Sequence, residues 1–402
     1  MLNEINNLIQ EADEKLEGKI HRTPLDYSAT FSKISGGKIY LKLENLQKTG
    51  SFKVRGALFK IMRNLDIAKK RGVIAASSGN HAQGVAYSSS IMGVPATIVM
   101  PEITPPFKVN ATKSYGANVI LQGTVYDEAY GRALEISKEN GAMLIHPFND
   151  PEIIAGQGTI GVEILRALPD VDEVVVPIGG GGLISGIGTA IKMRRSNVKI
   201  IGVEPKGDPK YFLSRKMGSI AKVDPQPSLA DGVITKSVGD LTFNIMNEVV
   251  DDVITVSEDS IARAIYLLME RTKLVVEGAG ALPLAALLEG GSIGKGGKKA
   301  VLVLSGGNID LTTLYRIILR GLSADGRIVE IDLVLRDSPG ELKKALEVIY
   351  KYRGNILEIR HDRMGLKLPP GYARAELIVE LPSKEEEPEV RKELERAGFM
   401  LS

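Results

Sequence analysis

The segment TGSFKVRGA, residues 49–57, contains a lysine whose amine can be held uncharged. Ser51 is a good helix N-cap, so the pattern places Lys53 in the first turn of a helix, where the helix dipole disfavours a positive charge. The like charge of Arg55 and desolvation by apolar neighbours also lower the pKa of a lysine. A neutral lysine amine can form a Schiff base with a carbonyl cofactor. Lys53 is therefore a catalytic candidate, although a lysine in this pattern is more often a solvated residue on a helix surface.

The glycine run in PIGGGGLISGIG, residues 177–188, is a candidate phosphate site. It follows the apolar stretch DEVVVPI and precedes a predicted helix. Successive backbone N–H groups at a helix N-terminus bind phosphate well, and four adjacent glycines cost more backbone entropy than an ordinary turn requires. We therefore expect an anion at Gly179, Gly180, Gly181 and Gly182, with a tight structural turn as the alternative.

A nicotinamide dinucleotide site is the main rival for this glycine run. Glu204 ends the next predicted strand, about where a ribose-binding acid would lie. The run, however, does not fit the register G-x-G-x-x-G, and that fingerprint is weak even when it is complete. We therefore do not favour a nicotinamide-dependent dehydrogenase.

Two further segments carry polar groups at predicted strand ends. SSGNHAQG, residues 77–84, offers hydroxyl, amide and imidazole groups beside free helix N–H groups, which suits a carboxylate. A capped strand–helix turn explains this segment equally well. In LSGGNIDL, residues 304–311, Ser305 follows an apolar strand, and ligands of parallel α/β sheets gather at such ends. A lone serine there is usually structural.

The elements that must position these residues alternate between strand and helix from about Lys38 to Arg320. Near-continuous apolar strands that alternate with amphipathic helices are typical of parallel sheets covered on both faces, divided here between two α/β domains. The predicted strands are KIYLKL, GVIAAS, ATIVMP, NVILQ, AMLIH, DEVVVPI, VKIIGVE, DDVITVS and AVLVLSG. The predicted helices include residues 84–92, 126–139, 151–168 and 259–271.

The pattern changes after a predicted helix at residues 311–320. The segment GLSADGR predicts a linker at residues 321–326, and residues 327–402 then follow the order β-α-β-β-α. This order indicates a separate ferredoxin-like unit. Its last strand is expected to be short or missing.

Composition excludes several classes of function. The net charge is only +2, from 51 basic and 49 acidic residues, which argues against a nucleic-acid or anionic-membrane partner. Cysteine is absent and the four histidines lie far apart in the sequence, so we expect no metal centre. The acidic N-terminus resembles neither a signal nor a transit peptide, and no stretch suits a membrane span, so we expect a cytoplasmic protein.

Together these segments resemble the threonine dehydratase, or threonine ammonia-lyase, family of fold-type-II pyridoxal-phosphate enzymes, which also includes serine racemase. The resemblance covers about residues 18–319 and depends on SFKVRGA, SSGNHAQG, HPFND, GGGGL, LADG, VVEGAGA and SGGNIDL, which occur in the family's order. It implies a two-domain α/β fold of the tryptophan synthase β type with open parallel sheets. The catalytic domain would span residues 1–320, with a small subdomain at about 45–145. The C-terminal unit, with RDSPGEL, resembles an ACT domain.

The resemblance implies roles for individual residues. Lys53 and Ser78 would be catalytic, and Lys53 would hold the pyridoxal 5'-phosphate. The cofactor's ring hydroxyl, phosphate and pyridine nitrogen would meet, respectively, Asn80, the glycines Gly179, Gly180, Gly181 and Gly182, and Ser305. The residues that would receive the substrate carboxylate are Ser77, Ser78, His81 and Asn149. The residues that would line the surroundings of the ring are Gly232 and Glu277.

The implied reaction is the α,β-elimination of L-threonine to 2-oxobutanoate and ammonia, and of L-serine to pyruvate. An ACT-like unit favours threonine dehydratase over a serine dehydratase or serine racemase, because racemisation has less need of feedback control. A non-catalytic amino-acid sensor would need neither Lys53 nor the glycine run. Serine racemase-like members bind a divalent cation after the strand that ends here at Glu204, but the segment EPKGDPKY contains Lys210 and makes a metal doubtful.

The ACT-like unit also suggests regulation by a small molecule. ACT domains commonly bind amino-acid effectors, and we expect such an effector near residues 337–342 and Asn355. The resemblance further suggests a homo-oligomer, either a dimer or a tetramer.

Overall fold

The computed structural model describes residues 1–364 and 368–401 and divides the chain into two compact units, Met1–Ile309 and Asp310–Ser402. This division lies before the predicted boundary at residue 320. Helix α14 (Leu311–Ala324) belongs to the second unit and runs through most of the predicted linker at 321–326. Gly321, which suggested a break, is instead buried within this helix.

The larger sheet of the first unit has six strands in the order β1-β2-β10-β7-β8-β9. The strands from β2 to β9 are parallel to their neighbours, as predicted, and β1 pairs antiparallel with β2 at one edge. The short and mostly exposed β1 was not predicted, because it has no apolar run. The strands are β1 (Leu25–Tyr27), β2 (Lys38–Leu43), β7 (Glu173–Pro177), β8 (Lys199–Pro205), β9 (Asp252–Val256) and β10 (Lys299–Leu304).

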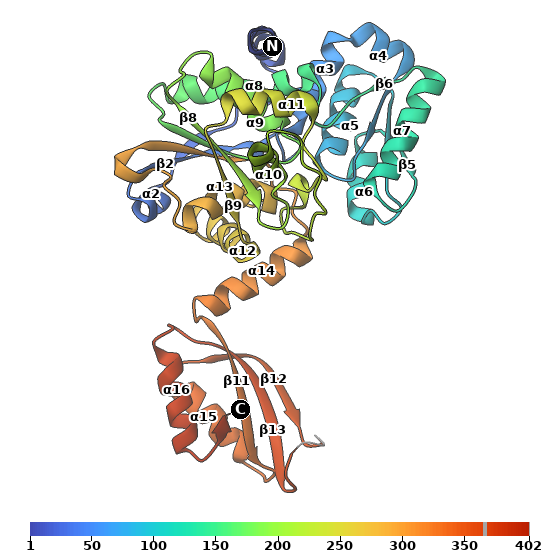
Figure 1. The fold of residues 1–402 in the computed structure, drawn as a ribbon. Helices are drawn as coiled ribbons and strands as arrows, with labels where there is room; N and C mark the ends of the chain where they lie inside the picture. The colour runs from blue at the N-terminus through green and yellow to red at the C-terminus, as the bar shows by residue number, and fades with distance from the viewer. Residues whose placement is uncertain (365–367, 402) are drawn as a thin grey trace. The chain divides into compact units, whose positions relative to one another are not determined.

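The smaller sheet of the first unit is also parallel, in the order β5-β4-β3-β6. Its strands are β3 (Val73–Ala76), β4 (Ala96–Met100), β5 (Asn118–Leu121) and β6 (Met143–Leu144). They lie within the range of about 45–145 that we predicted for the small subdomain. In Figure 1 this sheet and its helices α4 to α7 form the light-blue and cyan part of the ribbon.

Helices connect successive parallel strands in both sheets, because a parallel pair requires a crossover connection. The first unit contains α1 (Leu2–Leu16), α2 (Ala29–Ser35), α3 (Lys53–Arg63), α4 (Leu65–Arg71), α5 (Asn80–Met92), α6 (Pro106–Ser114), α7 (Tyr126–Asn140), α8 (Pro151–Ala167), α9 (Gly182–Lys192), α10 (Lys210–Met217), α11 (Asp240–Val249), α12 (Glu258–Leu267) and α13 (Gly278–Leu288). The four helices predicted from periodicity are all present, with small differences at their ends.

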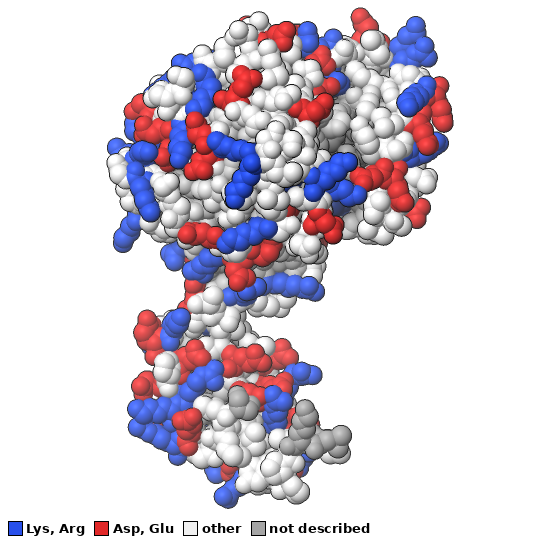
Figure 2. Space-filling model, viewed as in Figure 1, with Lys and Arg blue, Asp and Glu red and all other residues white. Residues whose placement is uncertain are grey.

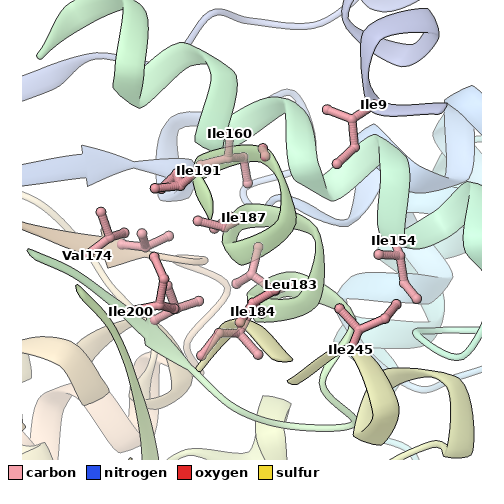
Figure 3. Packing of buried hydrophobic residues seen from close by; sticks show 14 of the residues in the cluster. Ile9, Ile154, Ile160, Val174, Leu183, Ile184, Ile187, Ile191, Ile200 and Ile245 are labelled. Carbon is pink, nitrogen blue, oxygen red and sulfur yellow. The ribbon is translucent and has the colours of Figure 1, made fainter. Parts of the chain in front are cut away.

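Helix α9 lies in the centre of the main core, and every residue from Gly182 to Ile191 is buried. Its apolar side chains meet those of α1, α8, α11 and the strands β7 and β8 (Figure 3). The residues labelled there are Ile9, Ile154, Ile160, Val174, Leu183, Ile184, Ile187, Ile191, Ile200 and Ile245. The glycine run at the start of α9 is therefore anchored by a helix that is packed on all sides.

The second unit contains α14 and an antiparallel sheet in the order β12-β13-β11-β14. Alternate residues of β11 and β13 are buried and pack against α15 and α16. The predicted β-α-β-β-α order is confirmed, and the last strand is short, as expected. The elements are β11 (Ile328–Arg336), α15 (Glu341–Lys351), β12 (Asn355–Asp362), β13 (Tyr372–Glu380), α16 (Glu386–Arg396) and β14 (Met400–Leu401).

The surface carries both signs of charge. On the face shown in Figure 2, Lys and Arg side chains are interspersed with Asp and Glu, in keeping with the net charge of +2. Within the described residues, no helix has the length and apolar character needed to cross a membrane.

The packing of α9 against α8 leads to a stability prediction. A Cβ at Gly186 would lie 2.3 Å from the carbonyl oxygen of Ile154 and 2.6 Å from the backbone nitrogen of Gly158. We expect Gly186→Ala to lower the free energy of unfolding by about 1–3 kcal/mol, because the two helix backbones must separate. The control Gly131→Ala, in α7, adds a Cβ with no atom within 4 Å and should raise stability by about 0.5–1 kcal/mol. Urea unfolding midpoints would test both, and an unchanged midpoint for Gly186→Ala would contradict the tight contact.

Candidate active site

Helix α3 begins at Lys53, so the predicted position of this lysine in a first helical turn is confirmed. The predicted cap is wrong, because Phe52 occupies the N-cap position and makes no side-chain cap hydrogen bond. Ser51 is fully buried, and its hydroxyl has no hydrogen-bond partner among the described residues. Instead, Ser51 forms an isolated β-bridge with Gly306, which joins the start of α3 to the segment after β10.

The amine of Lys53 is bound by a carbonyl group: Nζ donates to the carbonyl oxygen of Pro147 at 2.9 Å. Among the described residues, no carboxylate lies within hydrogen-bond distance of this amine. Burial lowers the pKa of Lys53 to about 8, against the opposing charge of Glu277. The predicted direction is confirmed, and its main cause is burial, which is the expected desolvation rather than the like charge of Arg55. The amine is thus uncharged in a useful fraction of molecules near neutral pH, as a nucleophile or base requires.

Arg55 has no exposed surface and is held by two carboxylates. Nε and Nη2 donate to Glu44 at 2.8 Å each, and Nη1 donates to Glu163 at 2.7 Å. Lys42 completes the cluster through a 2.5 Å ion pair with Glu163, so two cations balance two anions. Burial would raise the pKa of Glu44, but Arg55 and Lys42 outweigh it and lower that pKa. This cluster fixes α3 two residues beyond Lys53.

Close backbone contacts fix the same helix from two other sides. A Cβ at Gly84 of α5 would lie 3.0 Å from the carbonyl carbon of Lys53. On the other side, a Cβ at Gly156 of α8 would lie 2.5 Å from the Cα of Gly56. The backbones lie so close that a side chain at Gly156 would clash with α3, and a side chain at Gly84 would require the backbone of Lys53 to shift by a few tenths of an ångström. The final glycine of SSGNHAQG therefore has a packing role that the sequence did not predict.

The amide of Asn80, at the start of α5, lies in a hydrogen-bonded chain. Its Nδ2 donates to Oε1 of Glu277 at 2.7 Å, and its Oδ1 accepts from Nδ2 of Asn308 at 2.8 Å. Asn308 also donates to the carbonyl oxygen of Thr49 at 2.8 Å. These bonds fix the orientation of the Asn80 amide and leave one of its N–H groups available to a ligand.

Glu277 is a buried carboxyl group that is bound by this amide. Burial raises its pKa to about 7, Asp231 adds to the rise, and the hydrogen bond from Asn80 opposes it. A Cβ at Gly232 would lie 3.7 Å from Oε1 of Glu277 and 3.9 Å from Nδ2 of Asn80. The structure therefore brings LADG, VVEGAGA and SSGNHAQG together, as the resemblance implied.

The glycine run forms the turn between β7 and α9. Gly181 has φ +96°, a conformation that glycine adopts readily, and no described side chain caps the first N–H groups of α9. A Cβ at Gly180 would lie 2.3 Å from the ring of Phe148, and the carbonyl oxygen of Gly180 accepts from Oγ1 of Thr242 at 2.6 Å. The uncapped N–H groups at a rigid helix N-terminus fit a phosphate.

Ser77, Ser78 and His81 follow β3 but differ in their contacts. The hydroxyl of Ser77 accepts from the backbone N–H of Gly79 at 3.2 Å, whereas Ser78 forms no side-chain hydrogen bond with the described residues. The Nε2 atom of His81 lies 2.8 Å from the carbonyl oxygen of Ile145, and burial lowers its pKa to about 3. His81 is therefore neutral and cannot supply positive charge to a substrate carboxylate.

Asn149 of HPFND contributes to the start of α11. Its Nδ2 donates to Asp240 at 2.5 Å, and its Oδ1 accepts from the backbone N–H groups of Leu241 and Thr242. This side chain is thus already engaged, and it joins the segment after β6 to α11. The resemblance alone did not reveal this capping role.

Ser305 directly follows β10, as the strand pattern predicted, and it is 2% exposed. Its carbonyl oxygen accepts from the backbone N–H of Phe52 at 3.1 Å, so Ser305 lies next to the start of α3. The structure therefore places Ser305 near Lys53 through backbone contacts.

Three site residues were missed by reasoning from single residues. They are Pro147, whose carbonyl binds Lys53, Phe148, which covers the glycine run, and Asn308, which orients Asn80. All three lie in HPFND or SGGNIDL, so membership of these motifs was the available signal. Among the described residues, no group of three or more His, Cys, Asp and Glu is placed to hold a metal ion.

The cluster around Arg55 leads to a prediction with a control on the same helix. Arg55→Met should lower the free energy of unfolding by about 3–5 kcal/mol, because Glu44 and Glu163 would lose their buried partner. Arg63→Met should cost no more than about 1 kcal/mol, because that side chain is 34% exposed in its ion pairs with Glu11 and Glu152. Urea denaturation of the two variants would test this, and equal midpoints would contradict it.

The site can be compared with known proteins. A family model described as "Pyridoxal-phosphate dependent enzyme" matches residues 16–306. The L-threonine ammonia-lyase of Thermotoga maritima is 48% identical over 391 residues, which cover 97% of each chain. Threonine deaminase isoform 2 from Solanum lycopersicum has a TM-score of 0.74 at 38% identity and covers 79% of this chain and 87% of its own. Maize serine racemase also has a TM-score of 0.74, at 36% identity, with 79% and 98% covered. The chain therefore belongs to the pyridoxal-phosphate dependent enzymes of fold type II.

Proposed function

We propose that this chain is a threonine ammonia-lyase that deaminates L-threonine to 2-oxobutanoate and ammonia by α,β-elimination, and L-serine to pyruvate. The observation that carries the proposal is the environment of Lys53. Its amine is bound to a neutral carbonyl and has a pKa of about 8, so it can join a carbonyl cofactor and later accept a proton. The Thermotoga maritima relative, similar over nearly its full length, supports threonine as the substrate.

The residues around Lys53 fit the bound cofactor. When bound, pyridoxal phosphate supplies a conjugated ring that spreads the negative charge left on the substrate's α-carbon. Lys53 Nζ would take the α-proton, the free N–H of Asn80 would meet the ring hydroxyl, and the N–H groups of Gly179–Gly182 would hold the phosphate. Ser305 would lie at the ring nitrogen. A hydroxyl there does not keep the nitrogen protonated as a carboxylate does, which favours loss of the β-hydroxyl over transamination.

The substrate carboxylate would bind at the start of α5. Ser77 and Ser78 are partly exposed, and Ser78 has its hydroxyl available for a ligand, so it is also the second catalytic candidate. The contribution of His81 would be that of a neutral, fixed ring, because its Nε2 is engaged by Ile145. Asn149 would act indirectly, by holding the segment after β6 in place.

A serine racemase or serine dehydratase is the second candidate. The similarity to maize serine racemase favours it, because both reactions begin with removal of the same α-proton. Loss of the β-hydroxyl separates elimination from racemisation, so the products separate the two candidates.

The central prediction is that Lys53→Ala lowers 2-oxo acid release from L-threonine and L-serine by at least about 10²–10⁴-fold, the usual contribution of one general base. The exposed Lys48, on the loop before α3, offers the control Lys48→Ala, which should retain full activity. Release should be faster from L-threonine than from L-serine. Turnover of serine alone would move the assignment to a serine dehydratase. Racemised serine without 2-oxo acid would establish the second candidate.

We also propose that an amino-acid effector binds at residues 337–342 of the C-terminal unit. We further propose that the chain forms a homo-oligomer, either a dimer or a tetramer.

The strand register places Asn355 relative to this proposed effector site. In β11, Ile328 pairs with Glu380 at one end of β13, and Arg336 pairs with Tyr372 at the other end. Asn355 pairs with Glu380, so it lies at the far end of the sheet from Asp337, roughly 25 Å away along the strands. The expectation that one copy of the unit joins these residues in a single pocket is therefore wrong.

The effector is tested by hydrogen exchange of the full chain in the presence of individual amino acids. An effector should slow exchange at residues 337–342 and change the rate of 2-oxo acid release at the same concentration. Unchanged exchange there with every amino acid, in active enzyme, would contradict the proposal.

A further inference from the structure

Three charged side chains without exposed surface lie outside the site described above. Glu204 is the next-to-last residue of β8, Asp208 lies in the turn after this strand, and Lys210 begins α10. Lys210 Nζ lies 2.8 Å from Oδ2 of Asp208 and 3.5 Å from Oε1 of Glu204. Fully buried charges are costly, and this cluster carries a desolvation cost that well-packed apolar residues would avoid.

The cluster depends on its single cation. Burial raises the pKa of both Glu204 and Asp208, and Lys210 opposes the rise in each case. Glu204 also accepts from the backbone N–H groups of Tyr211 and Phe212 at 2.9 Å each. Asp208 is less well satisfied, because its Oδ1 has no hydrogen-bond partner among the described residues. Without the ammonium group of Lys210, each of the two buried carboxylates would lose its positively charged partner.

The cluster also contacts two segments that border the glycine run, the residue before Gly179 and the segment at residues 233–235. Lys210 Nζ reaches the carbonyl oxygen of Ile178, the residue before Gly179, at 3.5 Å. Asp208 Oδ2 accepts from the backbone N–H of Thr235 at 3.2 Å. Thr235 is two residues after Val233. Val233 packs closely on Gly179, because a Cβ at Gly179 would lie 3.1 Å from the Cα of Val233. The two segments that border Gly179 are thus tied to one ammonium group, directly or through Asp208.

We propose that Lys210 is a positioning residue, an internal cation whose ammonium group holds the 178–182 turn and the 233–235 segment in the arrangement that binds the cofactor phosphate. The inference rests on the proposed phosphate role of Gly179–Gly182. Lys210 touches no substrate or cofactor and acts through Ile178 and Asp208. The rival explanation is a purely structural ion cluster that only holds α10 against β8.

The experiment compares Lys210→Ala with Lys216→Ala, an exposed lysine of the same helix that lies over the ring of Phe212. The equilibrium dissociation constant for pyridoxal phosphate and the urea unfolding midpoint of the cofactor-free protein are measured for each. We expect Lys210→Ala to weaken cofactor binding by at least about tenfold, a change of about 1.4 kcal/mol, and Lys216→Ala to leave it unchanged. Both measurements are independent of catalytic activity.

Chemical rescue separates positioning from a merely structural role. Methylammonium ion is small enough to occupy the space left by the lysine side chain, whereas tetramethylammonium has no N–H group and is too bulky. Methylammonium chloride should restore cofactor affinity in Lys210→Ala, and tetramethylammonium chloride at the same concentration should not. Should Lys210→Ala fail to fold, Lys210→Met retains most of the side-chain volume and should show the same loss of affinity.

The outcomes distinguish the inference from the function on which it rests. Weakened binding that methylammonium restores supports the positioning role. Unchanged affinity in Lys210→Ala, even with a lowered unfolding midpoint, would overturn it in favour of the structural cluster, as would weakened binding that both salts restore equally or neither restores. If the unaltered chain itself failed to bind pyridoxal phosphate, the phosphate role of Gly179–Gly182 would fall instead.

Discussion

The rest of the site depends on the ion pairs that the buried guanidinium group of Arg55 forms with Glu44 and Glu163. Arg55 is two residues from Lys53 on the same helix. Its guanidinium group donates hydrogen bonds to Glu44, which follows β2, and to Glu163, which lies in α8. Because two cations balance two anions in a largely buried cluster, the cluster has one favourable arrangement and resists small displacements. That arrangement sets the place of Lys53, whose amine forms no ion pair with a carboxylate among the described residues and donates to the carbonyl of Pro147.

The remaining site residues come from the ends of strands and the first turns of helices. Asn80 begins α5, the glycine run leads into α9, Glu277 precedes α13 and Ser305 follows β10. In parallel sheets these positions meet at one edge, which is why segments far apart in the sequence form one site. The larger sheet contributes the glycine turn at residues 179–182 and Ser305, and the smaller sheet contributes the segment expected to receive the substrate.

Sequence reasoning predicted the features that follow from local pattern. The parallel strands, the first-turn position of Lys53 and the turn at Gly179–Gly182 were all recognisable from apolar runs, glycine content and motif order. It did not predict features that depend on partners distant in the sequence. Ser51 has the chemistry of a cap but is drawn into a bridge with Gly306, and Gly321 has the chemistry of a break but is buried in α14. Asn149 and Glu277 acquire their partners only when the two sheets come together.

The glycine contacts around α3 have a consequence for protein engineering. Gly84 and Gly156 bring the backbones of α5 and α8 close against α3, so that an added methyl group would clash at Gly156 and would require the backbone of α3 to shift at Gly84. The helix that presents Lys53 therefore has almost no mutational tolerance on these two faces. A library aimed at new amino-acid substrates would waste most of its members there.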